Sequence, residues 1–388
     1  MATSIQSRPA GVDTRLLFID NIRWTLIVLV ICHHAAVTYS HVGGWYYMDG
    51  PKPGMIPTVL FATFETFNQA YFMGLLFLIA GYFVPRALDS KGAGRFLKDR
   101  AARLGFPSLV FMLVIHPFTV YWLLRNFDNP SIPPLTKAYP GFITSGRFLG
   151  ATGPMWFAVA LLLFCAVYAM CRAVSPRLRV KQYPMPGHSQ VFALIGLMGV
   201  CTFLVRIVQP IGVNVLNMQL CYFSQYILLF TVGIFAYRGN WLGKIPRAFG
   251  LFWMVLALAV GIPAWFAILW TSGALQGDSS RLLGGFHWQS AAFSFWESLF
   301  CVGMCLGLIV LFRDGFNQQG RFSKWMSRNS FSAYLFHTPL LVAVTLALKN
   351  VSAPIGIKFL VAALIAVPVT FLVSGLLRPI LPGLRKVL

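Results

Sequence analysis

Charged side chains are scarce in this sequence, and acidic ones are the scarcest. Of the 388 residues, 11% are charged and only 10 are Asp or Glu, whereas 57% are hydrophobic. The mean hydropathy is +0.71. Soluble domains carry about 25% charged residues, so this composition excludes an ordinary soluble protein and indicates a polytopic membrane protein.

The shortage of acidic residues leaves a net charge of +21. In a soluble chain such a charge would favour nucleic-acid binding. Here the lysines and arginines lie in short breaks between apolar runs, where membrane proteins use them to set their orientation. We therefore expect the lipid bilayer, and no nucleic acid, as a partner.

Sequence patterns for disulfides and metal sites are also missing. The seven cysteines lie in or at the ends of apolar runs, with no paired spacing in a polar loop, so a disulfide framework or thiolate metal site is not expected. No cluster of the HExxH type is present for zinc, and no repeated pairing of histidines for a haem. We expect no bound metal.

Ten apolar runs are long enough to cross a bilayer, which takes about 20 helical residues. The fifth has the weakest pattern. We expect an all-α fold with a membrane domain over 16–377, flanked by tails at 1–15 and 378–388. The predicted spans are 16–40, 57–85, 104–124, 154–174, 190–208, 218–238, 248–271, 288–312, 330–349 and 355–377.

The distribution of lysine and arginine predicts the orientation of these spans. Most of the 31 basic residues fall on the side that would hold both ends of the chain, with a dense group at 86–103. Because cytoplasmic loops carry the excess of Lys and Arg, we expect both termini in the cytoplasm. Residues 1–14 are polar and the first apolar run is too long for a signal-peptide core, so no cleavage is expected.

Ionisable residues within a bilayer are costly and therefore mark candidate functional sites. Each has a structural alternative, because a buried histidine or carboxyl often serves only to bond a neighbouring helix. Away from their ends, the predicted spans contain Asp20, Arg23, His33, His34, Glu65, His116, Glu297 and His337.

Helical geometry separates the two adjacent histidines of the first span. Successive helical residues point about 100° apart, whereas residues eleven apart return to nearly the same face. His34 therefore shares a face with Asp20 and Arg23, about 16 Å further along the helix. His33 projects away from that face, so we interpret His34 as the candidate catalytic residue and His33 as structural. A neutral imidazole can take a proton from a hydroxyl or attack a thioester itself.

Two arginines and two glutamates complete the candidate residues. Arg100 and Arg103 lie one helical turn apart, and paired guanidiniums bind phosphates well, although the positive-inside rule alone also explains them. Glu65 and Glu297 would each be protonated, face water, or pair with Arg23 or a histidine.

Ten aromatic residues are expected near the outer boundary of the membrane. They are typical of an interfacial belt, with sugar stacking as the less favoured interpretation. They are Trp45, Tyr46, Tyr47, Tyr121, Trp122, Tyr139, Phe142, Trp265, Trp270 and Trp288.

Four segments together resemble acyltransferase family 3, a family of integral membrane enzymes. "FIDNIRWTLIVLVICHHA" resembles its opening helix, in which Asp20, Arg23 and His34 occupy the recurring positions. The 72–107 segment is similar to the family's R-x-x-R region, and "GPMWFAVALLL" and "NSFSAYLFHTPL" to later segments that contain Trp156, Tyr334 and His337. Within the family, this sequence most resembles the members that are similar to glucan biosynthesis protein C.

This resemblance implies transfer of an acyl group from a cytoplasmic acyl-CoA to a hydroxyl of a carbohydrate or related acceptor. We then expect His34, Arg23 and Asp20 to be catalytic and Arg100 and Arg103 to bind the donor. The expected location is a cell membrane, a bacterial plasma membrane by analogy with the family, and the sequence leaves a homo-oligomer open. Expected substrate-binding residues are Glu65, Glu297, Trp156 and His337.

Two other functions fit the same residues. Intramembrane His, Glu and Arg also form the proton relays and substrate sites of secondary transporters, which would show inverted repeats and move a substrate without any acyl donor. A passive exporter or sensor subunit would bind a ligand without turnover.

Overall fold

The computed structural model describes residues 16–175 and 183–380. It is 81% helical and has no strands within these ranges, and ten of its helical segments are long and apolar enough to cross a membrane. The expected all-α polytopic fold is confirmed, including the weak fifth span. The expected tail at 1–15, and all but the first three residues of the one at 378–388, lie outside the described residues.

Nine spans are built around one α-helix each, and the third is a composite. Short helices α6 (Leu135–Thr144), α10 (Trp241–Lys244) and α12 (Ser280–Leu283) lie between spans. The nine are α1 (Leu17–Ser40), α2 (Met55–Lys91), α7 (Trp156–Val174), α8 (His188–Val208), α9 (Phe223–Gly239), α11 (Arg247–Ser272), α13 (Trp288–Gly315), α14 (Arg321–Ala347) and α15 (Ile355–Ile380).

The second and third spans are longer than predicted. Helix α2 continues past residue 85 to Lys91, and the third span begins at Ala93 rather than at 104. Hydropathy marks only the apolar part of a helix, whereas the helix itself continues where polar side chains find partners. Asp89 forms ion pairs with Arg172 of α7 and Arg238 of α9, which ties the end of α2 to both helices.

The third span is irregular because it contains two prolines. It joins α3 (Ala93–Arg100), α4 (Phe106–Val110) and α5 (Arg125–Phe127) through π-helical turns at Ala101–Gly105, Phe111–Ile115 and Phe118–Leu124. Pro107 and Pro117 have no amide proton to donate to the preceding turn. At Leu113, whose carbonyl Pro117 leaves free, the Tyr139 hydroxyl donates a hydrogen bond at 3.1 Å.

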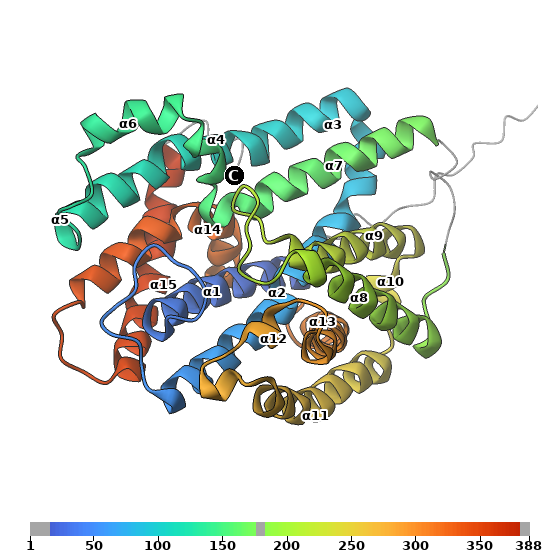
Figure 1. Ribbon diagram of the computed structural model, residues 1–388. Coiled ribbons are helices and arrows are strands. Elements are labelled where there is room, and N and C mark those ends of the chain that lie inside the picture. The colour runs from blue at the N-terminus through green and yellow to red at the C-terminus, as the bar shows by residue number, and fades with distance from the viewer. Residues whose placement is uncertain (1–15, 176–182, 381–388) are drawn as a thin grey trace, which may run out of the picture.

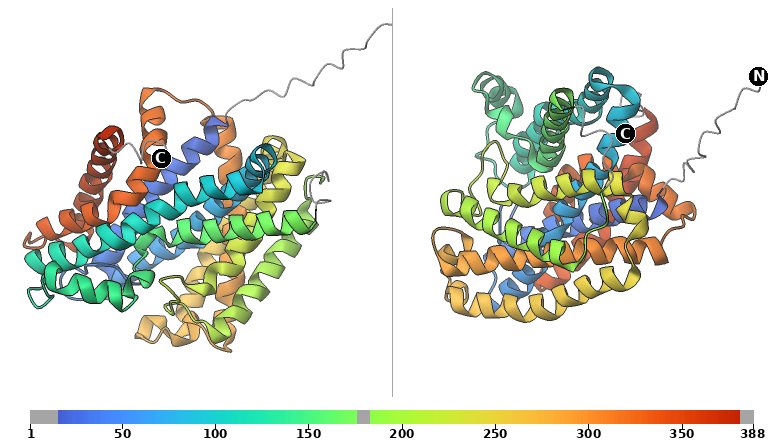
Figure 2. Two further views of the ribbon diagram at one scale, coloured as in Figure 1. Left: turned by 90° about the horizontal axis from the view of Figure 1, so that it is seen from above. Right: turned by 90° about the vertical axis from the view of Figure 1, so that its right-hand side faces the viewer.

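Helix α1 lies in the interior of the bundle, in contact with α2, α13, α14 and α15 (Figure 1). Phe18, Ile19, Ile22 and Ile31 of α1 are almost completely buried against these neighbours. The other views show the long helices side by side in one bundle (Figure 2). A side chain on α1 is therefore shielded from lipid on most sides.

The connecting segments form two polar ends of the bundle. We call the end where α1 terminates the loop end. There the side-chain amide of Asn217 donates to Thr152 Oγ1 at 3.1 Å, and the backbone amide of Ile211 donates to Leu283 O at 2.8 Å. At the other end, where α1 begins, the side-chain amide of Asn21 donates to the carbonyl oxygen of Phe316 at 2.6 Å. We call this the α1-start end.

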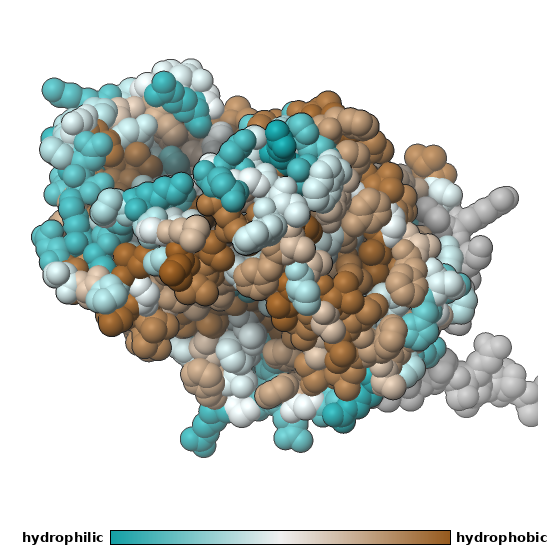
Figure 3. Space-filling view, turned by 60° about the horizontal axis from the view of Figure 1, so that its bottom comes forward, coloured by the Kyte–Doolittle hydropathy of each residue, from teal (hydrophilic) through white to brown (hydrophobic). Residues whose placement is uncertain are grey.

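Large apolar side chains stay exposed on the outside of the bundle between these ends. Met170 of α7 is 67% exposed, Val255 of α11 58% and Leu364 of α15 74%. Figure 3 shows broad hydrophobic areas on one face, with hydrophilic side chains at their borders. Such a surface is stable in contact with lipid tails and would be unfavourable in water.

Helices α2 and α9 pack closely because glycines face each other's backbones. A Cβ added to Gly81 of α2 would lie 2.1 Å from the Phe230 carbonyl oxygen, and one added to Gly233 of α9 would lie 2.2 Å from the Leu78 carbonyl oxygen. Small residues allow this approach between membrane helices, whose association depends on van der Waals contact.

We expect Gly233→Ala to destabilise the protein by about 1–3 kcal/mol, because the added methyl group forces α9 away from α2. Melting temperature in detergent would measure the loss. Gly196→Ala in α8 is the matched control, since a Cβ there meets no atom within 4 Å. Equal melting temperatures for the two variants would contradict the close packing.

Candidate active site

His34 of α1 lies in a stack of three nearly parallel rings. Its imidazole is 3.9 Å, centroid to centroid, from the indole of Trp45, with 13° between the planes. On α14, the imidazole of His337 is 5.5 Å away at 12°. The stack thus joins α1, α14 and the segment 41–54, which follows α1 at the loop end.

Polar atoms of this stack are buried without partners. Within the described part of the chain, no hydrogen-bond partner is present for His34 Nδ1, His337 Nε2 or Trp45 Nε1. Buried polar groups in proteins are nearly always hydrogen-bonded, so each such atom needs an explanation. Three of them lie together in this stack, with His33 Nδ1 beside it, which makes the stack a candidate site for the polar atoms of a ligand.

The backbone of α14 determines which nitrogen of His337 carries the proton. His337 Nδ1 lies 2.7 Å from the carbonyl oxygen of Tyr334, which only accepts hydrogen bonds, so Nδ1 is the donor. In the neutral ring, Nε2 then carries the lone pair. His337 Nε2 is therefore available as a hydrogen-bond acceptor.

The two adjacent histidines face different neighbours, as the helical repeat predicts. The His33 ring packs against Phe72 of α2, 5.3 Å between centroids, whereas His34 faces Trp45 and His337. The two imidazoles still touch edge to face at 5.5 Å. Only His34 belongs to the stack with His337.

The segment 41–54, which we call the Trp45 loop, folds back over α1. Its chain reverses at Gly43, whose φ of 87° favours glycine, and the Asp49 amide donates to Thr38 O at 2.9 Å. Tyr46 and His116 of the third span share a hydrogen bond of 2.9 Å. Burial raises the pKa of Tyr46 well above its usual value, so its hydroxyl stays protonated.

A second segment, 152–156, packs against the Trp45 loop. It lies where the chain passes from the third span to the fourth. Gly153 has a φ of 47°, and a Cβ there would lie 2.5 Å from the Phe111 ring and 2.7 Å from the Tyr46 hydroxyl oxygen, so glycine is favoured at this position. The Tyr334 hydroxyl donates to the carbonyl of Pro154. Trp156 begins α7 and stacks on Tyr226 of α9, 5.6 Å between centroids.

The predicted acid and base of α1 form an ion pair near the α1-start end. Arg23 Nη1 lies 3.5 Å from Asp20 Oδ1, and the guanidinium lies 4.9 Å from the ring centroid of Phe83 on α2. The Arg23 side chain is 38% exposed, so the pair is not sealed from ligands. Eleven residues of helix, about 16 Å, separate Arg23 from His34.

Arg100 and Arg103 lie where α3 gives way to the first π-helical turn. The Arg100 guanidinium is half-buried, 5.2 Å from the ring centroid of Phe96, and Arg103 is exposed. The wider π turn changes the direction of the side chains that follow it, and such turns are frequent at functional sites. Arg103 is free to reach a ligand at the surface.

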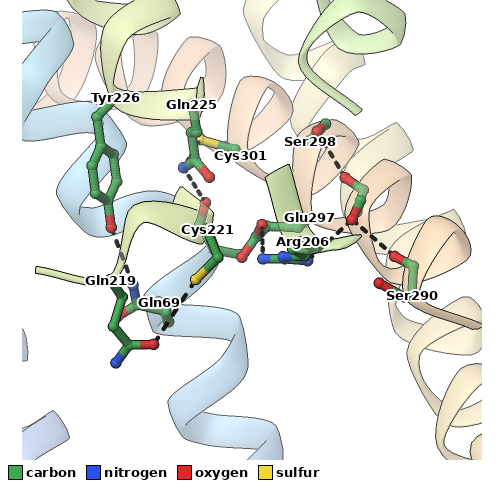
Figure 4. A network of polar contacts seen from close by, with 12 residues as sticks. Gln69, Arg206, Gln219, Cys221, Gln225, Tyr226, Ser290, Glu297, Ser298 and Cys301 are labelled. Carbon is green, nitrogen blue, oxygen red and sulfur yellow. Dashed lines mark hydrogen bonds and ion pairs between the residues drawn. The ribbon is translucent and has the colours of Figure 1, made fainter. Parts of the chain in front are cut away.

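The two predicted intramembrane carboxyls have partners other than those expected. Glu65 accepts a hydrogen bond of 2.7 Å from Ser40 at the end of α1. Glu297 pairs with Arg206 of α8, 2.7 Å between Nη2 and Oε2, with both side chains almost fully buried (Figure 4). Of the alternatives open from the sequence, pairing with a cation therefore holds for Glu297, with Arg206 in place of Arg23 or a histidine.

Sequence reasoning missed Arg206 because it is in the last turn of its helix. A basic residue at the end of the predicted span 190–208 is expected at the membrane interface, yet the Arg206 side chain is 0% exposed and also donates to Ser294 Oγ at 3.3 Å. The signal that would have found it is Glu297, a carboxyl deep in an apolar helix that needs a cation.

Trp45 and Lys358 were also assigned differently from the sequence. Trp45 was interpreted as part of an interfacial belt, but its ring packs on His34 inside the bundle. A lysine at the start of the predicted span 355–377 is expected at the membrane interface, but Lys358 is buried in α15 and pairs with Asp49. Both positions depend on how the Trp45 loop folds, which no local pattern reports.

The ring stack thus lies within a bundle of ten apolar spans, and its unpartnered polar atoms make it the candidate site of a membrane protein. A family model described as an acyltransferase domain matches residues 16–378. The chain belongs to acyltransferase family 3 and is a multi-pass membrane acyltransferase. Neither the curated proteins nor the solved structures include a match to it.

Proposed function

We propose that the protein transfers an acyl group from acyl-CoA to a hydroxyl of a carbohydrate or related acceptor, with His34 as base or acyl carrier. The observation that carries the proposal is the ring stack, in which His34 Nδ1 and His337 Nε2 are buried with no hydrogen-bond partner within the described residues. Together they provide a nucleophilic or basic nitrogen beside a second acceptor for the same hydroxyl.

Two routes fit this arrangement. In the first, His34 takes the proton of the acceptor hydroxyl, whose oxygen attacks the thioester carbonyl; the C–S bond breaks and the thiolate receives that proton. In the second, a nitrogen of His34 attacks the carbonyl and expels the thiolate. The hydroxyl oxygen then attacks the acyl carbon, the C–N bond to His34 breaks, and the hydroxyl proton passes to the thiolate. In both, His337 Nε2 orients the hydroxyl by accepting its hydrogen bond.

Acyl-CoA is proposed to enter at the α1-start end. Arg103 is exposed and Arg100 half-buried near that end of the third span, so their guanidiniums are available to the donor's phosphates. The donor's flexible arm would then pass the Asp20–Arg23 pair and cover the helical rise of about 16 Å to His34. Arg23 and Asp20 would position this arm.

The acceptor is proposed to approach from the loop end. With both termini in the cytoplasm of a bacterial cell, the loop end would face outward and the donor side inward. His337 lines the proposed acceptor position. The other residues predicted to bind substrate are Glu65, Glu297 and Trp156. A homo-oligomer is also still a prediction.

The direct test uses the full chain purified in detergent. Incubation with labelled acetyl-CoA and succinyl-CoA should release free coenzyme A at a rate above that of the thioester alone. Acid-quenched samples should show labelled protein if His34 carries the acyl group. Neither product with any thioester, with or without an added carbohydrate acceptor, would contradict the proposal.

We expect the Arg100→Gln/Arg103→Gln variant to raise the KM for acyl-CoA at least tenfold with a smaller change in kcat, since it removes donor phosphate contacts far from the reacting carbonyl. Steady-state coenzyme A release measures both constants. Arg95→Gln/Lys98→Gln, which removes two other basic residues of α3, is the control for net charge. An unchanged KM would show that Arg100 and Arg103 do not bind the donor and serve only to orient the protein in the membrane.

A further inference from the structure

The Trp45 loop is fastened to α15 by a buried ion pair. The Lys358 ammonium contacts the Asp49 carboxylate, and the two side chains are only 8% and 5% exposed. Tyr47 of the same loop donates its hydroxyl to Asp49 Oδ1 at 2.8 Å. The loop is therefore tied by charge to a helix that begins more than 300 residues later in the chain.

Such a pair is costly to bury unless it holds a defined geometry. Both ions lose their hydration, and only close contact with further hydrogen bonds offsets that loss. These further bonds are present, because Lys358 also donates to the carbonyl of Lys349 at 3.3 Å and lies 5.9 Å from the Tyr39 ring centroid. The contact between the Lys358 ammonium and the Asp49 carboxylate thus lies beside the last turns of α1.

The anchored residue lies close to the ring stack in the chain and in space. The Asp49 amide bonds to Thr38 O at 2.9 Å, one helical turn after His34, and Trp45 precedes Asp49 by four residues. The indole itself makes no hydrogen bond within the described residues. Its place on His34 therefore depends on what holds the loop: the turn at Gly43, the Tyr46–His116 hydrogen bond and the Asp49 pair.

We propose that Asp49 and Lys358 are positioning residues that hold Trp45 over His34 and keep water from the imidazole at the loop end. The proposal rests on the catalytic role given to His34 above. With the loop in place, the acyl group passes to a bound acceptor hydroxyl. With the loop released, water attacks the acyl carbon, the C–S bond breaks, and free carboxylic acid and coenzyme A leave.

The test uses the Asp49→Asn/Lys358→Met variant of the full chain, in which both charges are removed together so that neither stays buried alone. The control is Asp128→Asn/Lys349→Met, which removes an ion pair of the same end whose side chains are 33% and 35% exposed. Hydrogen exchange of amides 41–54 reports the loop. Coenzyme A release from acetyl-CoA and succinyl-CoA without added acceptor reports attack by water.

We expect amides 41–54 to exchange at least tenfold faster in the Asp49/Lys358 variant and acceptor-free coenzyme A release to rise about threefold or more. The control variant should leave both unchanged, and Lys358→Arg, which keeps the charge, should leave the loop protected. Unchanged exchange, or faster exchange without faster release from an active enzyme, would overturn the inference. Faster exchange with no release by any variant, wild type included, would support the positioning and contradict the proposed reaction instead.

Discussion

We expect His34→Ala to lose at least a hundredfold in coenzyme A release while the protein still inserts and purifies as wild type. A positioned base contributes about 10²–10⁴ in rate, and a covalent carrier at least as much. His337 does not occupy the place of His34, because its ring belongs to α14 and lies 5.5 Å from the His34 ring, centroid to centroid. The measurement is the steady-state rate with saturating acyl-CoA, together with the size-exclusion profile.

His33→Ala is the matched control for this variant. It removes the same side chain one position earlier, from a ring that packs on Phe72 rather than in the stack with His337. We expect it to retain activity within a few fold. Full activity of His34→Ala, or equal losses in both variants, would contradict the assignment of His34.

The second large effect is expected at the Arg206–Glu297 pair. Arg206→Met should destabilise the protein by about 3–5 kcal/mol, because it leaves the Glu297 charge buried without its partner. Arg206 is 0% exposed and Glu297 2%, so water cannot replace the lost contact without opening α8 from α13. Melting temperature in detergent and the yield of monodisperse protein would measure the loss.

The double variant Arg206→Met/Glu297→Leu separates structure from function at this pair. Apolar side chains of similar size often replace a buried ion pair at little cost, so the double variant should recover most of the stability. If it also recovers activity, Glu297 has no part in binding substrate. A stable but inactive double variant would support the predicted substrate contact, and a double variant no more stable than the single would contradict the ion-pair argument.

The sequence determined the membrane-spanning framework. A span must match the thickness of the bilayer, and the length of an apolar run can be read locally. The ten spans, including the fifth, therefore follow from the apolar runs of the sequence alone. The separation of His33 from His34 is local too, because it depends only on the turn of one helix. Family motifs further indicated acyl transfer, which the match over residues 16–378 bears out.

Local patterns also set the limits of that prediction. Hydropathy missed the polar continuation of α2 to Lys91 and the π turns of the third span, because hydrogen bonds and prolines, rather than apolar character, determine them. Arg206 and Lys358 lie at helix ends, where basic residues normally anchor a span at the interface. Nothing in their local sequence distinguishes a buried partner from such an anchor.

Tertiary structure alone decided which polar groups meet. Glu297 meets Arg206 because α13 packs against α8, and Asp49 meets Lys358 because the Trp45 loop returns between α1 and α15. Trp45 joins His34 for the same reason. In a low-dielectric interior each charge requires a partner, but which partner it finds depends on helix faces brought together from distant parts of the chain.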